Sequence, residues 1–246
     1  MLNQVTLSRL DELGLRGMAQ ALTLQWDHPE VSRMAFEERL GLLLDAEMTL
    51  RENRRIERLL KMAKLRETTA CLEDLDFRPE RHLDRSVINT LTDCNWMRRR
   101  QSLMLTGPTG SGKSWLACAF GKQACRNGIS TYYTTATQFF EDLQRAQLEG
   151  SLPKLRGMLV RTVLLIIDDL GIGGISVELG PVLLDIIDRH AAQGALIVTS
   201  QFPCKKWYDL FNDPTVADAI LDRIVHRAHF IDLKGESMRK LRGKNT

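Results

Sequence analysis

Apolar residues recur at near-helical spacing close to the start of the chain. The first such set is Leu10, Leu13, Met18 and Leu22. This spacing predicts a helix over residues 7–24, and the sequence Trp26-Asp27-His28-Pro29 after it indicates a turn. A second, longer helical pattern begins near Ser32, a residue type favoured at helix N-caps, and continues to Leu60. We therefore expect a small all-α N-terminal domain over residues 1–70.

Beyond residue 70 the pattern changes to short apolar runs separated by helical segments. The strand-like runs are residues 102–106, 129–134, 163–167 and 195–200. Their alternation with helical segments is typical of a parallel sheet with helices on both faces. The sequence Phe77-Arg78-Pro79 marks the entry, because a residue before proline tends to leave the helical conformation. We expect an α/β domain over residues 71–246.

The composition is that of a globular protein with one sizeable domain and a smaller one. The chain has 246 residues, of which 43% are hydrophobic. Its 34 Lys and Arg against 31 Asp and Glu give a net charge of only +3, so affinity for a polyanion must come from local clusters. The sequence starts Met1-Leu2-Asn3-Gln4-Val5, without the basic flank and apolar run of a signal peptide, and the apolar runs are strand-sized. We expect a cytoplasmic protein with no membrane partner.

Basic residues gather on one side of the second predicted helix. They are Arg51, Arg54, Arg55, Arg58, Lys61 and Lys64, mostly three or four residues apart. Charge alone leaves two interpretations open. The stripe either binds a polyanion such as nucleic acid, or it is a solvated face balanced by Glu47, Glu52, Glu57 and Glu67.

A glycine-rich loop joins the first strand-like run of the second domain to a helical segment. It reads Gly107-Pro108-Thr109-Gly110-Ser111-Gly112-Lys113-Ser114. Glycines allow consecutive backbone N–H groups to point inward, where they hold phosphates together with the positive end of the following helix. We expect Lys113 to reach the β and γ phosphates of ATP, and the Ser114 hydroxyl to bind Mg²⁺. The strand-loop-helix context predicts an ATP site.

Two carboxylates follow the third strand-like run. Asp168 and Asp169 stand at the carboxyl end of a buried strand, the edge where ligands of parallel sheets bind. We expect Asp168 to bind Mg²⁺ and Asp169 to orient and deprotonate the water that attacks the γ-phosphate. Glutamate is commoner at the second position, so the shorter Asp169 leaves the efficiency of hydrolysis an open question. The next run ends in the polar residues Thr199-Ser200-Gln201, which either sense the γ-phosphate or the attacking water, with Ser200 as the main candidate, or form a turn.

The order of these strands and the sequence after them resemble the AAA+ ATPases of the initiator and helicase-loader branch. The resemblance covers roughly residues 75–235 and includes Asp222-Arg223 within the helical stretch 217–226. In that superfamily an arginine at the place of Arg223 reaches into the nucleotide site of the neighbouring subunit, which implies that ATP binding and self-association are linked. Arg227 is a competing candidate for this role. Arg223 could also be an ordinary surface arginine paired with Asp218 or Asp222.

Within this branch the sequence is most similar to the IstB-type transposition helper ATPases of bacterial insertion sequences. The matching features are Leu13-x-x-x-Gly17-Met18-Ala19, Arg58-Leu59-Leu60-Lys61-x-Ala63-Lys64-Leu65, Leu72-Glu73-Asp74-Leu75-Asp76-Phe77, Leu83-Asp84-Arg85, Trp207, Asp213-Pro214, Ala219-Ile220-Leu221-Asp222-Arg223 and Gly235-Glu236-Ser237-Met238-Arg239. The resemblance implies an ATPase that assembles on duplex target DNA, as a ring or filament closed by ATP, and delivers that DNA to a partner transposase. A second sensor arginine has no clear counterpart, and Arg239 is the candidate for it.

The implied DNA path gives the basic clusters a function. Contacts to phosphates are largely independent of sequence and suit a protein that accepts many targets. The first candidates for DNA contacts are Arg51, Arg54, Arg55, Arg58 and Lys61 of the basic stripe. Arg98-Arg99-Arg100 and residues 144–161 are the second and third candidates.

Three other functions remain open from the sequence. A replicative helicase loader of the same branch shares the strand that ends in Asp168-Asp169, but should prefer single-stranded DNA and a helicase partner. A small-molecule kinase could use the same phosphate loop, although it would have no use for Arg223. A non-hydrolysing, ATP-gated DNA-binding module follows if Asp169 is a poor base.

Overall fold

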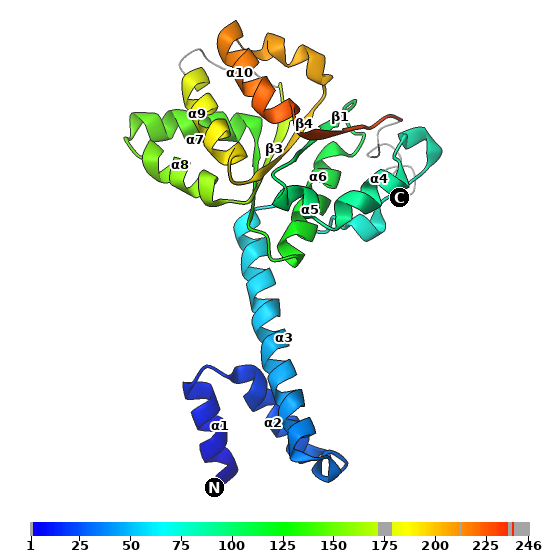
Figure 1. Ribbon diagram of the computed structural model, residues 1–246, viewed down its shortest axis with the longest axis vertical. Helices are drawn as coiled ribbons and strands as arrows, with labels where there is room; N and C mark the ends of the chain where they lie inside the picture. Colours follow the sequence, from blue (N-terminus) through cyan, green and yellow to red (C-terminus); the bar gives the residue numbers. More distant parts are fainter. Residues whose placement is uncertain (1, 172–178, 212, 236–237, 239–246) are drawn as a thin grey trace. The chain divides into compact units, whose positions relative to one another are not determined.

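The computed structural model describes residues 2–171, 179–211, 213–235 and 238. The chain divides into two compact units, residues 1–58 and 59–246. The first unit is helical and contains α1 (Leu2–Glu12), α2 (Arg16–Asp27), the 3₁₀ turn η1 (Val31–Arg33) and the larger part of α3 (Phe36–Ala63). The second unit begins within α3 and holds every described strand (Figure 1). The domain boundary near residue 70 stays a prediction.

Two helix boundaries differ from those that the apolar pattern predicts. The single helix predicted over residues 7–24 is wrong, because Gly14 separates α1 from α2. Gly14 has a φ of +73°, a left-handed conformation that ends helices and that glycine adopts without steric cost. The long helix begins at Phe36 rather than near Ser32, because the residues of η1 form a separate 3₁₀ turn.

The first turn of α2 packs closely against α3. A Cβ atom at Gly17 would lie 2.6 Å from the carbonyl oxygen of Ala46, so only glycine fits there. The Glu47 carboxylate accepts hydrogen bonds from the N–H groups of Gly17 at 2.7 Å and Met18 at 3.3 Å. These donors have no partner within their own helix. Arg51 pairs with the other oxygen of Glu47 at 2.6 Å, so one carboxylate joins the two helices.

Replacing Glu47 with glutamine is expected to destabilise the first unit by about 1–2 kcal/mol, because charge-assisted hydrogen bonds are lost. The hydrogen bond from Arg51, followed by those from Met18 and Gly17, holds the pKa of Glu47 below its ordinary value against the opposing effect of burial. The carboxyl of the unfolded chain therefore has the higher pKa. The stabilisation is complete above the ordinary Glu pKa of about 4.3 and is lost as the pH falls through the lower folded value.

Thermal unfolding of the wild type and the Glu47→Gln variant as a function of pH measures this effect. The difference in stability should be large at neutral pH and should shrink below about pH 4. Glu52→Gln, at an exposed position of the same helix, is the matched control and should have little effect. A difference for Glu47→Gln that does not depend on pH would show that the charge of this carboxylate is unimportant.

The second unit contains a five-stranded, wholly parallel sheet in the order β2-β3-β4-β1-β5. The strands are β1 (Ser102–Thr106), β2 (Thr131–Thr135), β3 (Leu164–Leu170), β4 (Ala195–Ser200) and β5 (Ala228–Asp232). The first four correspond to the predicted runs, and β1 and β4 have the predicted bounds. The carboxyl ends of β3, β4 and β1 are neighbours, so the segments that follow these strands meet at one edge of the sheet.

Helices cover both faces of this sheet, and the predicted α/β class is confirmed (Figure 1). One face carries α4 (Arg85–Thr92), α5 (Asn95–Arg98) and α6 (Lys113–Arg126), which share a core with Leu103 and Ile166. The other face carries α7 (Ala136–Leu148), α8 (Leu152–Arg161), α9 (Gly180–Ala191) and α10 (Pro214–Val225), which share a core with Met104 and Leu165. Short 3₁₀ turns connect these elements: η2 (Leu72–Asp74), η3 (Pro79–Arg81), η5 (Cys204–Lys206) and η6 (Tyr208–Leu210).

The apolar pattern does not predict β5, the strand at one edge of the sheet. Only Ile231 of its residues is buried, so the strand lacks the apolar run that marks the others. It pairs with β1 from Ala228 opposite Ser102 to Asp232 opposite Thr106. The Thr106 hydroxyl also donates to Asp232 at 2.9 Å. The strand is therefore recognised through its pairing and not through its composition.

The five cysteines are free thiols. Burial raises the pKa of Cys94 and of Cys118 to about 11, so both are protonated at neutral pH. None of the described helices combines the length and the apolar character needed to cross a membrane.

Candidate functional site

The phosphate loop, residues 107–112, leaves β1 and leads into the first turn of α6. Gly107 has a φ of +141°, and a Cβ atom there would collide with the carbonyl oxygen of Leu233. Leu233 follows β5 directly and is held in place by its N–H group, which donates to the Thr106 carbonyl at 2.8 Å. Gly112 has a φ of +96° at the start of α6. The end of the edge strand β5 thus shapes the loop.

Lys113 is almost completely buried beneath the loop. Its ammonium group donates to the carbonyl oxygens of Gly107 at 2.8 Å and Pro108 at 2.9 Å. Burial lowers the pKa of Lys113, and the charges of Asp169 and Asp168 oppose this effect. Carbonyl oxygens are neutral acceptors, so the charged oxygens of a phosphate would be stronger partners for this buried cation. The loop therefore fits a polyphosphate.

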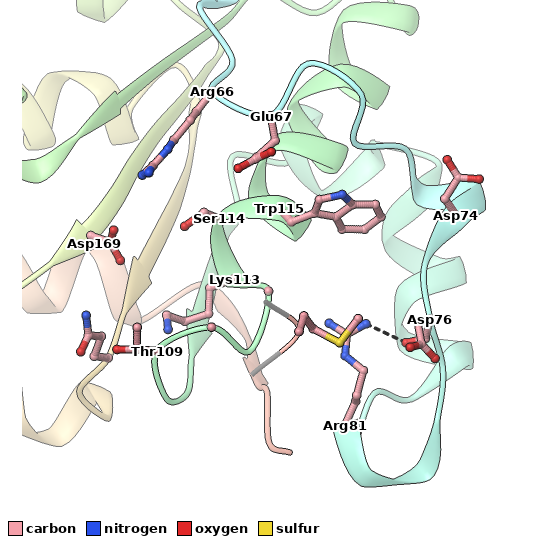
Figure 2. Close-up of a pocket in the computed structure, with 14 residues that line it drawn as sticks. Arg66, Glu67, Asp74, Asp76, Arg81, Thr109, Lys113, Ser114, Trp115 and Asp169 are labelled. Atoms are coloured by element: carbon pink, nitrogen blue, oxygen red, sulfur yellow. Dashed lines mark hydrogen bonds between the residues drawn. The ribbon is translucent and has the colours of Figure 1, made fainter. Parts of the chain in front are cut away.

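Asp168 and Asp169 leave β3 in different directions. Asp168 is fully buried, and its two oxygens accept hydrogen bonds from the Tyr133 hydroxyl, at 2.6 Å, and from the Thr199 hydroxyl. The same Thr199 oxygen accepts the N–H group of Asp169 at 2.9 Å. Asp169 has a φ of +59°, and the pairing of β3 with β4 is irregular at this point. This bulge turns the Asp169 side chain into the pocket described below (Figure 2).

Ser114 and Asp168 are the predicted ligands of Mg²⁺. Ser114 lines the pocket, while the Asp168 carboxylate is held behind it by Tyr133 and Thr199. Within the described part of the chain, no group of three or more His, Cys, Asp or Glu residues could hold a metal. Mg²⁺ in nucleotide sites takes one or two protein oxygens together with water and substrate phosphates. The residues therefore fit a phosphate-bound Mg²⁺ better than an ion held by the protein alone.

A pocket of about 360 Å³ lies beside the phosphate loop, a volume suited to a small ligand (Figure 2). The predicted residues that line it are Thr109, Gly110, Gly112, Lys113, Ser114 and Asp169. Gln201, one of the three polar residues named at the end of the fourth strand-like run, also lines it, and further lining residues that the sequence analysis missed include Arg66, Arg81 and Trp115. Arg66 and Arg81 precede the loop by many residues and belong to no spacing motif, so the sequence carried no signal for them.

Ser200 is not among the described residues that line the pocket. It is fully buried, and its hydroxyl donates to the Leu170 carbonyl at 2.6 Å. It also accepts the N–H group of Phe202 at 3.1 Å. These bonds connect the end of β4 with the end of β3, the kind of role that turn chemistry predicts for this position. Gln201, the next residue, lines the pocket in its place.

Arg81 is a buried arginine that connects the segment before α4 with the phosphate loop. Its Nη1 donates to the Asp76 carbonyl at 2.8 Å, and its Nη2 donates to the Ser111 carbonyl at 3.1 Å. A Cβ atom at Gly112 would lie 2.9 Å from the same Nη2, so the guanidinium also excludes a side chain there. Arg81 therefore holds the loop from its outer side.

The inter-subunit arginine and the basic stripe lie outside this pocket. Arg223 is exposed on α10, where its Nε pairs with Asp188 at 2.5 Å and its Nη1 donates to the Ala219 carbonyl at 3.1 Å. Arg227, the competing candidate, is exposed between α10 and β5. The stripe residues exposed on α3 are Arg51, Arg54, Arg55, Arg58 and Lys61. Arg239 lies outside the described residues.

Comparisons with known proteins agree with this arrangement. The model of the family described as IstB-like ATP binding protein matches residues 8–246. The insertion sequence ATP-binding protein y4uH of Sinorhizobium fredii (strain NBRC 101917 / NGR234) is 42% identical, over 98% of this chain and 97% of its own. The insertion sequence IS1162 ATP-binding protein of Pseudomonas fluorescens is 46% identical, over 82% of this chain and 88% of its own. The crystal structure of DnaI shares the fold, with a TM-score of 0.59 and 18% identity over 72% of this chain and 94% of that chain.

Proposed function

Because the chain belongs to the IstB-like ATP binding protein family and is an AAA+ ATPase, we propose that it assembles on duplex DNA and assists a transposase in insertion-sequence transposition. The observation that carries the proposal is the pocket that brings the phosphate loop, Lys113 and Asp169 together in a chain with this family match. The relatives at 42% and 46% identity are insertion sequence proteins. The family membership favours this function over the small-molecule kinase that the phosphate loop alone leaves open.

Hydrolysis uses the residues at the carboxyl edge of the sheet. ATP, bound with Mg²⁺, supplies the phosphoryl bond that is broken. The N–H groups of the loop and the Lys113 ammonium would hold the phosphates. The Ser114 hydroxyl would hold the metal, and the Asp168 carboxylate, fixed behind the pocket by Tyr133 and Thr199, would attract it from there. Asp169 orients the attacking water and accepts its proton. The bulge in β3 supports this role, because it brings the short Asp169 side chain into the pocket.

Arg223 acts on the nucleotide of the neighbouring subunit. Arg223 is exposed on α10 and is not among the described residues that line the pocket of its own subunit, which supports this role. The ion pair with Asp188 joins two exposed side chains, and such pairs contribute only about 0–1 kcal/mol. Moving Arg223 from Asp188 to a phosphate therefore costs little. Hydrolysis would then depend on assembly, since each site is completed by the next subunit.

Duplex DNA binds along the basic stripe of α3. The five side chains are exposed and fall on one side of the helix, where they can follow a line of phosphates. Arg51 is already paired with Glu47, so Arg54, Arg58 and Lys61 are the better candidates for the main contacts. Contacts of this kind do not select a base sequence, which suits the delivery of many different targets to a transposase.

Binding of a duplex and of a single strand of equal length, over a series of salt concentrations and with ATP present, tests the proposal. The triple variant Arg54→Gln, Arg58→Gln, Lys61→Gln should weaken duplex binding and reduce the salt slope by about one for each lost contact. The matched control replaces Arg98, Arg99 and Arg100 with glutamine and should bind as the wild type does. Loss of binding in the control alone would move the DNA path to these arginines. A preference for single strands would favour a helicase loader instead.

A further inference from the structure

Arg66 enters the nucleotide pocket from the segment between α3 and η2. This segment is anchored on both sides of Arg66, because Leu65 and Ala70 are buried in the core beneath α6. The Lys122 ammonium on α6 also donates to the Thr68 carbonyl at 3.2 Å. The backbone that carries Arg66 is therefore held in place, while its side chain is exposed at the edge of the pocket.

The Arg66 guanidinium lies at one end of the pocket. It is directed to the side of Asp169 and Ser114, whereas Asp76 and Arg81 lie at the opposite end, with the phosphate loop between them (Figure 2). Asp169 marks the end where the reacting phosphate is expected. A cation at this end therefore lies closer to the terminal phosphate of a bound nucleotide than to its base.

Hydrogen bonds connect Arg66 with the buried carboxylate of Asp168. The Tyr133 hydroxyl donates to Asp168 at 2.6 Å and accepts from Arg66, and this second bond raises the pKa of Arg66. A guanidinium has five N–H donors, so one bond to a phenol oxygen leaves several for another ligand. The phenol orients the guanidinium, and its remaining donors can meet an anion.

We propose that Arg66 binds the terminal phosphate of ATP within its own subunit. The planar guanidinium suits two parallel hydrogen bonds to phosphate oxygens, and ADP lacks the phosphate that would accept them. Arg66 thereby distinguishes ATP from ADP. The inference rests on the proposed nucleotide site and adds a contact to it.

Arg66 differs from Arg223 in acting without a neighbour. The contact forms in a single subunit, so it contributes to nucleotide affinity even where no assembly takes place. Arg223 contributes only across a subunit interface. An Arg223→Ala background therefore removes the inter-subunit contribution and leaves that of Arg66.

The test measures affinities for ADP and for the non-hydrolysable analogue AMP-PNP, each with Mg²⁺, by calorimetry on the full chain without DNA. In the Arg223→Ala background, Arg66→Gln should weaken AMP-PNP binding by about 10- to 100-fold, as expected for a charge-assisted contact. ADP binding should change by less than about 2-fold, and Arg66→Lys should give an intermediate value for AMP-PNP. Lys64→Gln is the matched control, because Lys64 is an exposed cation of the same segment that lies over the Tyr132 ring. It should leave both affinities unchanged.

Equal weakening of both nucleotides by Arg66→Gln would overturn the inference, because it would mean that Arg66 only supports the shape of the pocket. Unchanged affinities for both would overturn it as well. Failure of the parent protein to bind either nucleotide would instead contradict the proposed site itself, so the two failures are distinguishable.

Discussion

With Arg223 replaced by alanine, ATP hydrolysis by the DNA-assembled protein is expected to fall by about three orders of magnitude, the lower range for an arginine supplied by a neighbouring subunit. In the proposed assembly the guanidinium would add positive charge where negative charge spreads over the transferring phosphoryl group. The nucleotide affinity of single subunits should not change, because Arg223 is not among the described residues that line the pocket. Steady-state hydrolysis with duplex DNA and nucleotide affinity without DNA measure the two effects separately.

Mixing two inactive variants tests whether this arginine acts between subunits. Asp169→Asn keeps Arg223 but loses the proposed base, and Arg223→Ala keeps the proposed base but loses the arginine. In a mixed assembly, some sites combine an intact Asp169 with an intact Arg223 from the next subunit, so hydrolysis should exceed that of either variant alone. Arg227→Ala is the control and should retain hydrolysis. A mixture that stays inactive would mean that Arg223 has no role at the interface.

Replacing Lys113 with alanine is expected to reduce ATP hydrolysis by about 10²- to 10³-fold, as for the loss of one preorganised hydrogen-bond donor that stabilises the developing negative charge. ATP affinity should fall as well, because the buried ammonium lies beneath the loop whose N–H groups are expected to hold the phosphates. The stability of the fold should not decrease, because burying the charged ammonium is unfavourable, as the lowered pKa of Lys113 indicates. Measuring the hydrolysis rate, the ATP affinity and the thermal stability of the variant tests these three expectations separately.

Lys122→Ala is the matched control for Lys113, because both lysines lie on α6 and the Lys122 ammonium donates to the Thr68 carbonyl, away from the phosphate loop. It should keep near wild-type hydrolysis. If Lys113→Ala hydrolyses ATP at the wild-type rate, the phosphate loop is not the site of the reaction. If it unfolds, the lysine is needed for the fold and its catalytic role has to be tested with Lys113→Gln.

The parts of the second unit that the sequence predicts well are those where one physical requirement dominates. The strands β1 and β4 are buried on both faces and read as continuous apolar runs, so their bounds agree with the prediction. The phosphate loop is recognisable because its glycines adopt positive φ angles and approach other backbone closely, as Gly107 does at Leu233. The position of Asp168 at the carboxyl edge of the sheet follows from the buried apolar run that precedes it.

The features that escaped prediction depend on contacts between distant parts of the chain. The strand β5 is stabilised by pairing with β1 and has little apolar character of its own. Arg66 and Arg81 reach the pocket only because the segment after α3 returns to the phosphate loop in the fold. The bulge that separates Asp168 from Asp169 arises from the pairing of β3 with β4 and has no local signature.

The sequence does not show that Gln201 lines the pocket while Ser200 is buried, and the reason is geometric. Neighbouring residues of a strand point to opposite sides, so composition places a polar pair at the strand end without saying which member faces the ligand. Ser200 turns inward to the Leu170 carbonyl, and Gln201 lines the pocket. Gly14 is a similar case, because glycine is tolerated within a helix but here adopts the left-handed conformation that ends one.

Sedimentation of the purified protein with duplex DNA, in the presence of either ATP or ADP, tests the central claim most directly. The account predicts a large assembly with ATP and duplex DNA together, which forms neither with ADP nor with the Lys113→Ala variant. A protein that stays monomeric under all of these conditions would contradict it.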